Sequence, residues 1–215
     1  MTSLAPSLTA EDGRLFQPSR AWIAERLQWR PPAPRPDDRH IVSLPSGARV
    51  THAAVLLPLI NRADGVNVLL TQRTAHLHDH PSQISFPGGR VEGGDENRVE
   101  TALREAQEEI GLARDRIDIV GVLPDYEIPS GFRISPVVGW IEPPFELRLD
   151  AFEVSEVFEV PLAFVFDPAN HQRRTYHFNG RDRAYLAMLY QGRYIWGATA
   201  GILYSLYRQL AGDPW

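Results

Sequence analysis

The segment from residue 96 to 111, "ENRVETALREAQEEIG", combines a helical pattern with a dense group of acidic side chains. Its apolar residues recur at steps of three and four positions, which is the spacing of one face of an α-helix. These residues are Val99, Ala102, Leu103, Ala106 and Ile110. Glycine is common just past the end of a helix, so Gly111 is a natural stop. We therefore predict an amphipathic helix that ends before Gly111.

Three glutamates of this helix, Glu105, Glu108 and Glu109, face away from the apolar stripe, because residues three and four apart share a face. Two such charges about 6 Å apart repel by roughly 3 kcal/mol at an effective dielectric constant near 20. A divalent cation would offset this repulsion, and hard cations such as Mg²⁺ prefer oxygen ligands. Arg104 is adjacent in sequence and can orient a carboxylate by paired hydrogen bonds. The alternative is a solvated helix face.

A glycine-rich segment, "FPGGRVEGGD" (86–95), directly precedes the predicted helix. Glycines such as Gly88 and Gly89 allow the backbone to approach a ligand closely. Taken alone, the glycine pair also fits a plain turn. Together with an acidic residue and the arginine-glutamate helix at fixed spacing, the segment indicates a loop that approaches a bound ligand.

The rest of the chain predicts an α/β fold. Residues 51–60 and 66–73 have strand character and are separated by the turn sequence "NRADG". Helices are expected at 18–29, where a serine can cap the start, and at 197–210. Further strand-like segments are "QISF", "IDIVGVLPDYEI", "ISPVVGWI", "EVFEVPL", "RTYHF" and "RAYLAMLY". The order predicts an α/β/α sandwich around a mixed sheet, which is not a regular βαβ repeat.

Composition narrows the functional classes. The net charge of −5 gives no general attraction to nucleic acid or to an anionic membrane, so we expect neither as a partner. The chain has no cysteine, which excludes disulfides, thiolate metal sites and a cysteine nucleophile and fits a reducing cytoplasm. Apolar runs are far shorter than a membrane span, and the N-terminus lacks a signal-peptide pattern. We expect a soluble, cytoplasmic protein.

The glycine loop and the acidic helix together resemble a Nudix box, whose usual form is G-x5-E-x7-R-E-U-x-E-E-x-G-U, with U aliphatic. Gly89 opens the box, and "REAQEEIGL" (104–112) matches its second half if Ala106 is accepted as U. Asp95 stands where glutamate is usual, and eight residues separate it from Arg104. This spacing and the preceding "LLTQRTAHLHDHPSQISFPGG" (69–89) are similar to the coenzyme A pyrophosphatase branch. The resemblance covers about residues 50 to 210.

The resemblance implies a Nudix-type α/β/α sandwich at 38–215, after an N-terminal extension at 1–37 with a short helix and a proline-rich linker. It implies hydrolysis of coenzyme A or acyl-coenzyme A to 3′,5′-ADP and 4′-phosphopantetheine, with Mg²⁺ or Mn²⁺. Glu105, Glu108 and Glu109 would be the metal ligands, with Arg104 orienting them. The resemblance also implies a homodimer.

Two other functions stay open. One is a Nudix hydrolase acting on ADP-ribose or another nucleoside diphosphate derivative, because Thr74, His78 and Ser82 stand where the branch usually has a small residue, an arginine and a glycine. The other is a Nudix domain that senses a nucleotide without cleaving it. The intact set of Arg104 and the three box glutamates argues against the sensor.

The general base has candidates in the box and in a distant segment. Glu108 is the box candidate. Glu153 and Glu156, just before "VFEVPL", are the distant ones, and Glu156 is counted among the predicted catalytic residues. For the distant pair the alternative is exposed charge at the end of a strand. Asp95 is expected to support the loop or an outer-shell water, because its side chain is short.

Residues for substrate binding follow the same resemblance. The expected set is Arg73, Gly88, Gly89, Ser130, Gly131, Phe132 and Arg133. Arg73 would face the diphosphate unless it forms a surface salt bridge, and Ser130 to Phe132 would line the pocket unless they form a tight turn. Trp196 would stack on adenine or pack in the core. The alternating histidines His76, His78 and His80 fit a polar loop better than a metal site.

Overall fold

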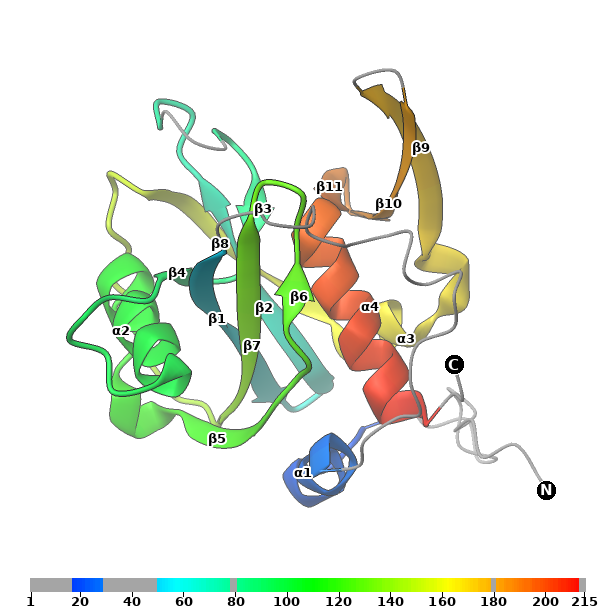
Figure 1. Ribbon diagram of the computed structural model, residues 1–215. Helices are drawn as coiled ribbons and strands as arrows, with labels where there is room; N and C mark the ends of the chain where they lie inside the picture. The colour runs from blue at the N-terminus through cyan, green and yellow to red at the C-terminus, as the bar shows by residue number, and fades with distance from the viewer. Residues whose placement is uncertain (1–16, 29–49, 78–80, 179–180, 213–215) are drawn as a thin grey trace, which may run out of the picture.

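The computed structural model describes residues 17–28, 50–77, 81–178 and 181–212 (Figure 1). The predicted boundary at residue 37, the proline-rich linker, His78 and His80 lie outside these ranges. None of the helices in the described ranges is long and apolar enough to cross a membrane.

The centre of the described structure is a mixed eight-stranded sheet. The strands β3, β2, β1, β7 and β5 lie in that order, while β4 pairs with β1, β6 with β7 and β8 with β2. Only the pairing of β1 with β7 is parallel among the pairings described for this sheet. The eight strands of this sheet are β1 Thr51–Arg62, β2 Gly65–Arg73, β3 Ile84–Ser85, β4 Gly88–Arg90, β5 Asp118–Val122, β6 Tyr126–Glu127, β7 Phe132–Ile141 and β8 Val154–Pro161.

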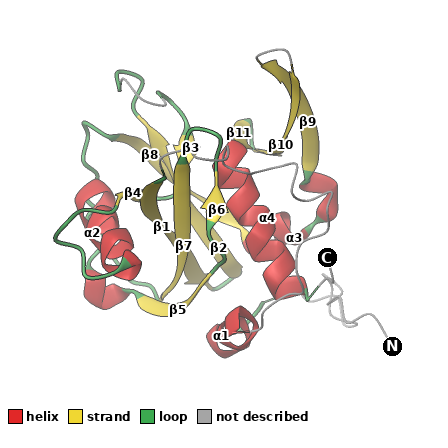
Figure 2. Ribbon diagram, viewed as in Figure 1, coloured by secondary structure: helices red, strands yellow, loops and turns green. Residues whose placement is uncertain are grey.

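Helices cover both faces of this sheet, as Figures 1 and 2 show. The helix α2 (Arg98–Ile110) packs on one face, and α3 (Leu162–Phe166) and α4 (Gly197–Ala211) pack on the other. Strand β1 serves both layers, because alternate side chains of a strand point to opposite faces. Leu56 packs in the α2 layer, whereas Leu57 packs in the α4 layer. The predicted α/β/α arrangement is confirmed.

A second, three-stranded antiparallel sheet follows β8 in sequence. It consists of β9 (Gln172–Phe178), β10 (Arg181–Tyr190) and β11 (Arg193–Trp196), with β10 in the middle. Leu186 and Met188 of β10 are buried in the α4 layer of the core. The strands β9 and β10 extend away from the central sheet, at the upper right of Figure 1.

Helices α2 and α1 begin or end at residues that are typical of helix termini. The Asn97 side chain accepts hydrogen bonds from the amides of Val99 and Glu100 at the start of α2, and Gly111 ends the helix with φ of 65°. Helix α1 (Arg20–Gln28) begins with the predicted serine cap, in which the Trp22 amide donates to Ser19 Oγ.

The predicted N-terminal extension contributes to the core. Ile23 of α1 is fully buried within the α4 layer, and Arg26 accepts a hydrogen bond through its carbonyl from Gln209 of α4. A helix of nine residues depends on tertiary packing for its stability, and the burial of Ile23 provides it here. Helix α1 is therefore packed on the same body as α4.

Two local predictions differ from the structure. The glycine-rich segment 86–95 was expected to be loop throughout, but Gly88–Arg90 forms β4 and pairs with β1. Segment 162–166 was not predicted as a helix and forms α3. Short apolar runs such as "LAFVF" fit a buried strand or a buried helix equally well, so periodicity cannot separate the two. Two 3₁₀ turns complete the described elements, η2 (Arg114–Arg116) and η3 (Pro168–Asn170).

Candidate active site

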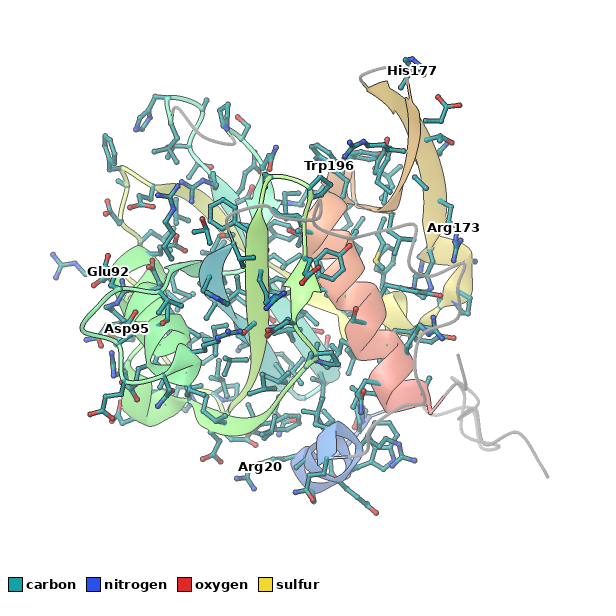
Figure 3. All side chains as sticks on the ribbon, viewed as in Figure 1. Arg20, Glu92, Asp95, Arg173, His177 and Trp196 are labelled. Atoms are coloured by element: carbon teal, nitrogen blue, oxygen red, sulfur yellow. The ribbon has the colours of Figure 1, made fainter. Side chains whose placement is uncertain are left out.

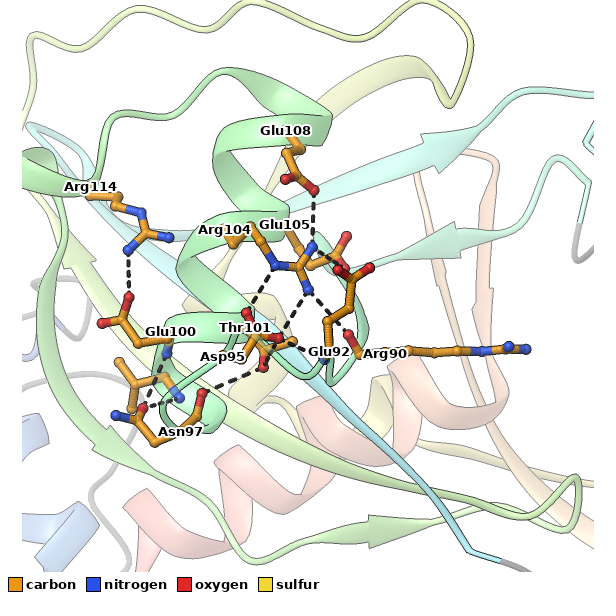
Figure 4. Close-up of polar contacts among 11 residues, drawn as sticks. Arg90, Glu92, Asp95, Asn97, Glu100, Thr101, Arg104, Glu105, Glu108 and Arg114 are labelled. Atoms are coloured by element: carbon orange, nitrogen blue, oxygen red, sulfur yellow. Dashed lines mark hydrogen bonds and ion pairs between the residues drawn. The ribbon is translucent and has the colours of Figure 1, made fainter.

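Arg104 is the centre of a hydrogen-bond network on the outer face of α2 (Figure 4). Its Nη1 donates to Glu105 Oε1 at 2.9 Å and to Glu108 Oε2 at 3.0 Å. Its Nε and Nη2 donate to the two oxygens of Asp95 at 3.0 and 3.1 Å, and Nη2 also reaches the Arg90 carbonyl at 3.2 Å. Arg104 thus fixes two box glutamates and the preceding loop in one arrangement.

Asp95 is fully engaged in holding this loop. Besides Arg104, its carboxylate accepts hydrogen bonds from Thr101 Oγ1 at 2.8 Å and from the Glu92 amide at 2.9 Å. Hydrogen bonds hold the pKa of Asp95 well below its usual range. The largest contribution comes from Arg104, and the next comes from the Glu92 amide. These contacts favour a supporting role for Asp95 over direct metal binding.

Glu109 lies behind the network, against the start of β4. It is 5% exposed, and its Oε2 accepts a hydrogen bond from the Gly88 amide at 3.3 Å. Burial raises the pKa of Glu109 to about 8, and the negative charges of Glu105 and Glu153 add to this rise. The nearest charge of opposite sign is Arg73, whose Nη1 lies 3.7 Å from Glu109 Oε1.

Glu105 is pressed against the backbone of β4. A Cβ atom placed on Gly89 would lie 2.5 Å from Glu105 Cδ, closer than real Cβ atoms come to another group. A side chain at position 89 would therefore force the Glu105 carboxylate to move from this position. Burial also raises the pKa of Glu105, while Arg104 opposes that shift.

Glu153 joins this group from a distant part of the chain. Its Oε2 lies 3.8 Å from Arg73 Nη1, so Arg73 stands between Glu153 and Glu109. The turn before β8 holds it in place, because its amide donates to the Asp150 carbonyl and its carbonyl accepts from the Thr74 amide. We call Glu105, Glu109 and Glu153 the carboxylate cluster.

Glu156 is not brought to the carboxylate cluster. It pairs with Gln72 in the register of β8 and β2, on the face that Phe158 and Val160 bury toward α4. Its carboxylate forms an ion pair with Arg193 of β11. The predicted catalytic residue Glu156 therefore lies on the sheet face opposite α2, because it alternates along β8 with Val157, which packs in the α2 layer.

The donor chemistry of the carboxylate cluster fits a hard divalent cation. Three carboxylates share a partly buried space, and the pKa of Glu109 is raised first by burial and then by the charges of Glu105 and Glu153, which Arg73 opposes. Within the described ranges, no three His, Cys, Asp or Glu side chains are already arranged to hold a metal ion. Arg104 bridges Glu105 and Glu108, and the Glu108 side chain is 60% exposed. Glu105 and Glu109 are more buried than Glu108 and are therefore the better-placed ligands.

A hollow of about 490 Å³ lies beside this network. It shares Asp95 and Arg104 with the network, and Arg114 on its wall bonds Glu100 at 2.5 Å. The complete lining is Glu92, Gly94, Asp95, Glu96, Glu100, Arg104 and Arg114. Its wall is mostly acidic, so it is a poor receptor for a phosphate group without added cations.

The predicted substrate residues 130–133 form a turn and an ion pair. Gly131 has φ of 96°, and its amide and carbonyl bond Ile128 and Thr51. Arg133 donates from Nε and Nη2 to Glu127 Oε1 at 2.9 and 2.7 Å. Phe132 is half-buried at the edge of the α4 layer, next to the turn at Gly131.

Trp196 and His76 occupy separate surfaces. Trp196 is 42% exposed and contacts the Tyr185 ring edge-on at 5.8 Å, near the start of α4 in Figure 3, so it is not a core residue. His76 follows β2 and its ring lies 4.9 Å from that of Phe152. The segment after β2 is closed by the Ser82 amide, which donates to the Thr74 carbonyl. Ser82 has φ of 59°, a conformation that glycine adopts more easily.

One polar network was not predicted from the sequence. Arg98 at the start of α2 donates to both oxygens of Asp125 at 2.9 and 2.8 Å, and its Nη2 lies 2.9 Å from His52 Nδ1. Ser135 of β7 also donates to Asp125, at 2.5 Å. These residues are far apart in sequence and meet because β1 pairs with β7 in parallel. No local sequence pattern predicts that pairing. The network fastens α2 to the sheet.

Comparisons with known proteins agree with this architecture. The family model described as NUDIX domain matches residues 50–178. Two curated proteins, both named "Uncharacterized Nudix hydrolase NudL", from Klebsiella pneumoniae subsp. pneumoniae and Enterobacter sp., are 39% identical to this chain; each match covers 75% of this chain and 84% of the relative. The solved structure of DR0079 from Deinococcus radiodurans has a TM-score of 0.50 at 14% identity, covering 75% of this chain and 87% of that chain.

Proposed function

This chain belongs to the Nudix hydrolase family, and from that premise we propose that it cleaves the diphosphate bond of coenzyme A or acyl-coenzyme A. The products would be 3′,5′-ADP and 4′-phosphopantetheine. The observation that carries the proposal of diphosphate hydrolysis is the carboxylate cluster, held against the glycine backbone of β4 by Arg104 and the Gly88 amide.

Glu105 and Glu109 would hold the metal, Mg²⁺ or Mn²⁺, with Glu108 at the exposed edge of the same site. A bound divalent cation neutralises phosphate oxygens and lowers the pKa of a bound water. Arg104 keeps Glu105 and Glu108 in fixed positions, and the Gly88 amide orients Glu109. These contacts restrain each side chain separately, and the carboxylates would still have to converge on the metal, since no three of them in the described ranges are already arranged to hold one.

We propose Glu153, in place of Glu156, as the distant acidic residue that takes the proton from the attacking water, with Glu108 as the box alternative. Glu153 faces Glu109 across Arg73, whereas Glu156 is paired with Arg193 on the other face of the sheet. A general base has to lie within reach of the water whose proton it takes, directly or through one further water.

Arg73 is proposed to bind the diphosphate. Its Nη1 lies 3.7 and 3.8 Å from Glu109 and Glu153, which is longer than a hydrogen bond. A cation at this position can turn toward phosphate oxygens without breaking a strong bond. Arginine binds phosphate well because its planar group offers paired donors.

Coenzyme A is proposed as the substrate because the segment 69–89 is similar to the signature of the coenzyme A branch. Thr74, His78 and Ser82 depart from that signature, and His78 lies outside the described residues. In the structure Thr74 bonds the Phe152 carbonyl, and Ser82 adopts the backbone conformation that suits glycine. Because of these departures, ADP-ribose is kept as the second candidate substrate.

A substrate panel tests this proposal. The protein would be incubated with Mg²⁺ or Mn²⁺ and coenzyme A, acetyl-coenzyme A, ADP-ribose, NADH or a diadenosine polyphosphate, and the products read by mass spectrometry. Release of 3′,5′-ADP from coenzyme A well above the other reactions is expected. Preferred cleavage of ADP-ribose or a dinucleotide would replace the substrate but keep the chemistry, and no cleavage at all would favour the sensor.

A further inference from the structure

We propose that Phe152, backed by His76, stacks against the base of the nucleoside in the substrate. This inference rests on the proposed function, because it places the base beside the carboxylate cluster that would act on the diphosphate. It assigns a substrate-binding role to a residue outside the box and outside the segment 69–89.

Phe152 is an unusually open aromatic side chain. It is 64% exposed, more than the other large apolar side chains left open in the described ranges, of which Leu189 at 54% comes next. Its contact with another ring is with His76, at 4.9 Å between ring centroids and with 60° between the ring planes. The two tilted rings form a corner that can receive a flat group.

The backbone of Phe152 is held firmly although its ring is open. Its amide donates to Asp150 Oδ1 at 2.8 Å, and its carbonyl accepts from Thr74 Oγ1 at 2.7 Å. The next peptide is also fixed, since the Glu153 carbonyl accepts from the Thr74 amide at 2.9 Å. An apolar ring held in water gains little stability for the fold, but a ring fixed in advance loses little entropy when a ligand binds.

The location of the ring connects it to the chemistry. Phe152 directly precedes Glu153, which shares Arg73 with Glu109 of α2. A diphosphate held at Arg73 and the carboxylate cluster would therefore carry its attached groups past this turn. The turn that holds Phe152 contacts the loop after β2 through Thr74. Phe152 and His76 therefore lie on the same side of the carboxylate cluster's entrance.

A nucleobase is the group that best fits this corner. Every base has a flat π-face, and stacking on an aromatic side chain stabilises it without reading its sequence. The nucleoside is also the part shared by all the substrates considered above, whereas the acyl chain belongs to one of them. Trp196, the other aromatic candidate for stacking, lies at the end of β11 against Tyr185.

Steady-state kinetics of Phe152 variants test the inference. Phe152→Ala is expected to raise KM about tenfold for both coenzyme A and ADP-ribose while kcat stays within about twofold, because stacking is lost from ground state and transition state alike. Phe152→Tyr, which keeps the flat ring, is expected to retain the wild-type KM. The matched control is Leu189→Ala, which removes the next most exposed large apolar side chain of the described ranges, from β10, and should leave KM unchanged.

Direct binding separates this inference from the proposed function. Calorimetry with ADP and with ribose 5-phosphate, in the presence of Mg²⁺, compares a ligand with the base and one without it. Phe152→Ala is expected to weaken ADP binding about tenfold and to leave ribose 5-phosphate binding unchanged. If this pattern appears in a protein that hydrolyses none of the substrates, stacking stands and the proposed function fails.

Two results would overturn the inference while leaving hydrolysis intact. One is an unchanged KM for coenzyme A and ADP-ribose in Phe152→Ala, together with unchanged ADP binding. The other is a rise in KM confined to acyl-coenzyme A, which would assign the ring to the acyl chain.

Discussion

At the scale of single residues, Gly89 determines how closely β4 approaches Glu105. The Glu105 carboxylate occupies the space that a Cβ atom on Gly89 would need. Gly93, four residues later in the same glycine-rich segment, has open space around its own Cβ position. The two glycines therefore differ in function although they look alike in the sequence.

We expect Gly89→Ala to reduce kcat by about 100-fold, because displacing a ligand side chain by about 1 Å misplaces the reacting groups. Gly93→Ala is the matched control and should retain most of the activity. Hydrolysis rates of the two variants, with circular dichroism to verify folding, check this. Equal activity in both variants would show that the contact of Gly89 with Glu105 has no part in catalysis.

At the scale of secondary-structure elements, α4 packs on β6 through another close contact. A Cβ atom on Gly201 would lie 2.7 Å from Tyr126 Cε2 and closer still to its hydroxyl oxygen. Burial raises the pKa of Tyr126 to about 12, consistent with a phenol enclosed between α4 and the sheet. Gly201 thus allows the helix to lie directly on this ring.

Gly201→Ala is predicted to lower the free energy of unfolding by about 1–3 kcal/mol through overpacking. A loss of stability would be informative, because alanine in place of glycine otherwise stabilises a helix by about 1 kcal/mol. Urea denaturation of Gly201→Ala, Tyr126→Leu and the double variant would measure it, because leucine removes the ring atoms that the new Cβ would meet. A smaller loss for Gly201→Ala in the Tyr126→Leu background supports the contact, and a Gly201→Ala variant as stable as wild type contradicts it.

The elements that were predictable from the sequence are those with strong local signals. The periodic stripe and Gly111 defined α2, and two apolar runs around a turn defined β1 and β2. Strand β4 was missed because three residues rich in glycine carry no strand pattern, and they are ordered only by pairing with β1.

Site residues show the same division. The box glutamates were identified from spacing, but the choice between Glu153 and Glu156 depended on which face of β8 packs toward α2 and on the contact of Glu153 with Arg73, neither of which the sequence displays.

At the scale of the whole molecule, the carboxylate cluster connects stability to pH and to metal. Glu109 has an ordinary pKa of 4.5, and burial in the folded protein raises it to about 8. At a pH between 4.5 and about 8, Glu109 holds a proton in the folded protein but has released it in the unfolded chain. Stability from this group is therefore fully present below about pH 4.5 and is lost as the pH rises through about 8.

For the metal-free protein, we expect the free energy of unfolding to fall from pH 5 to pH 8 relative to Glu109→Gln, by at most about 1.4 kcal/mol per pH unit. Adding Mg²⁺ should stabilise the wild type more at pH 8 than at pH 6, because metal binding requires deprotonated carboxylates. Urea titrations at each pH check both. Parallel pH curves for wild type and Glu109→Gln would mean that Glu109 does not titrate in this range.

The carboxylate cluster is proposed to perform metal-dependent hydrolysis of a nucleoside diphosphate derivative. The most direct measurement is the initial rate of coenzyme A and ADP-ribose hydrolysis in Mg²⁺ by wild type and Glu109→Gln, with and without EDTA. We predict hydrolysis by the wild type, its loss in EDTA, and a rate at least about 100-fold lower in the folded variant. Hydrolysis that persists in EDTA, or a Glu109→Gln variant as active as wild type, would contradict the account.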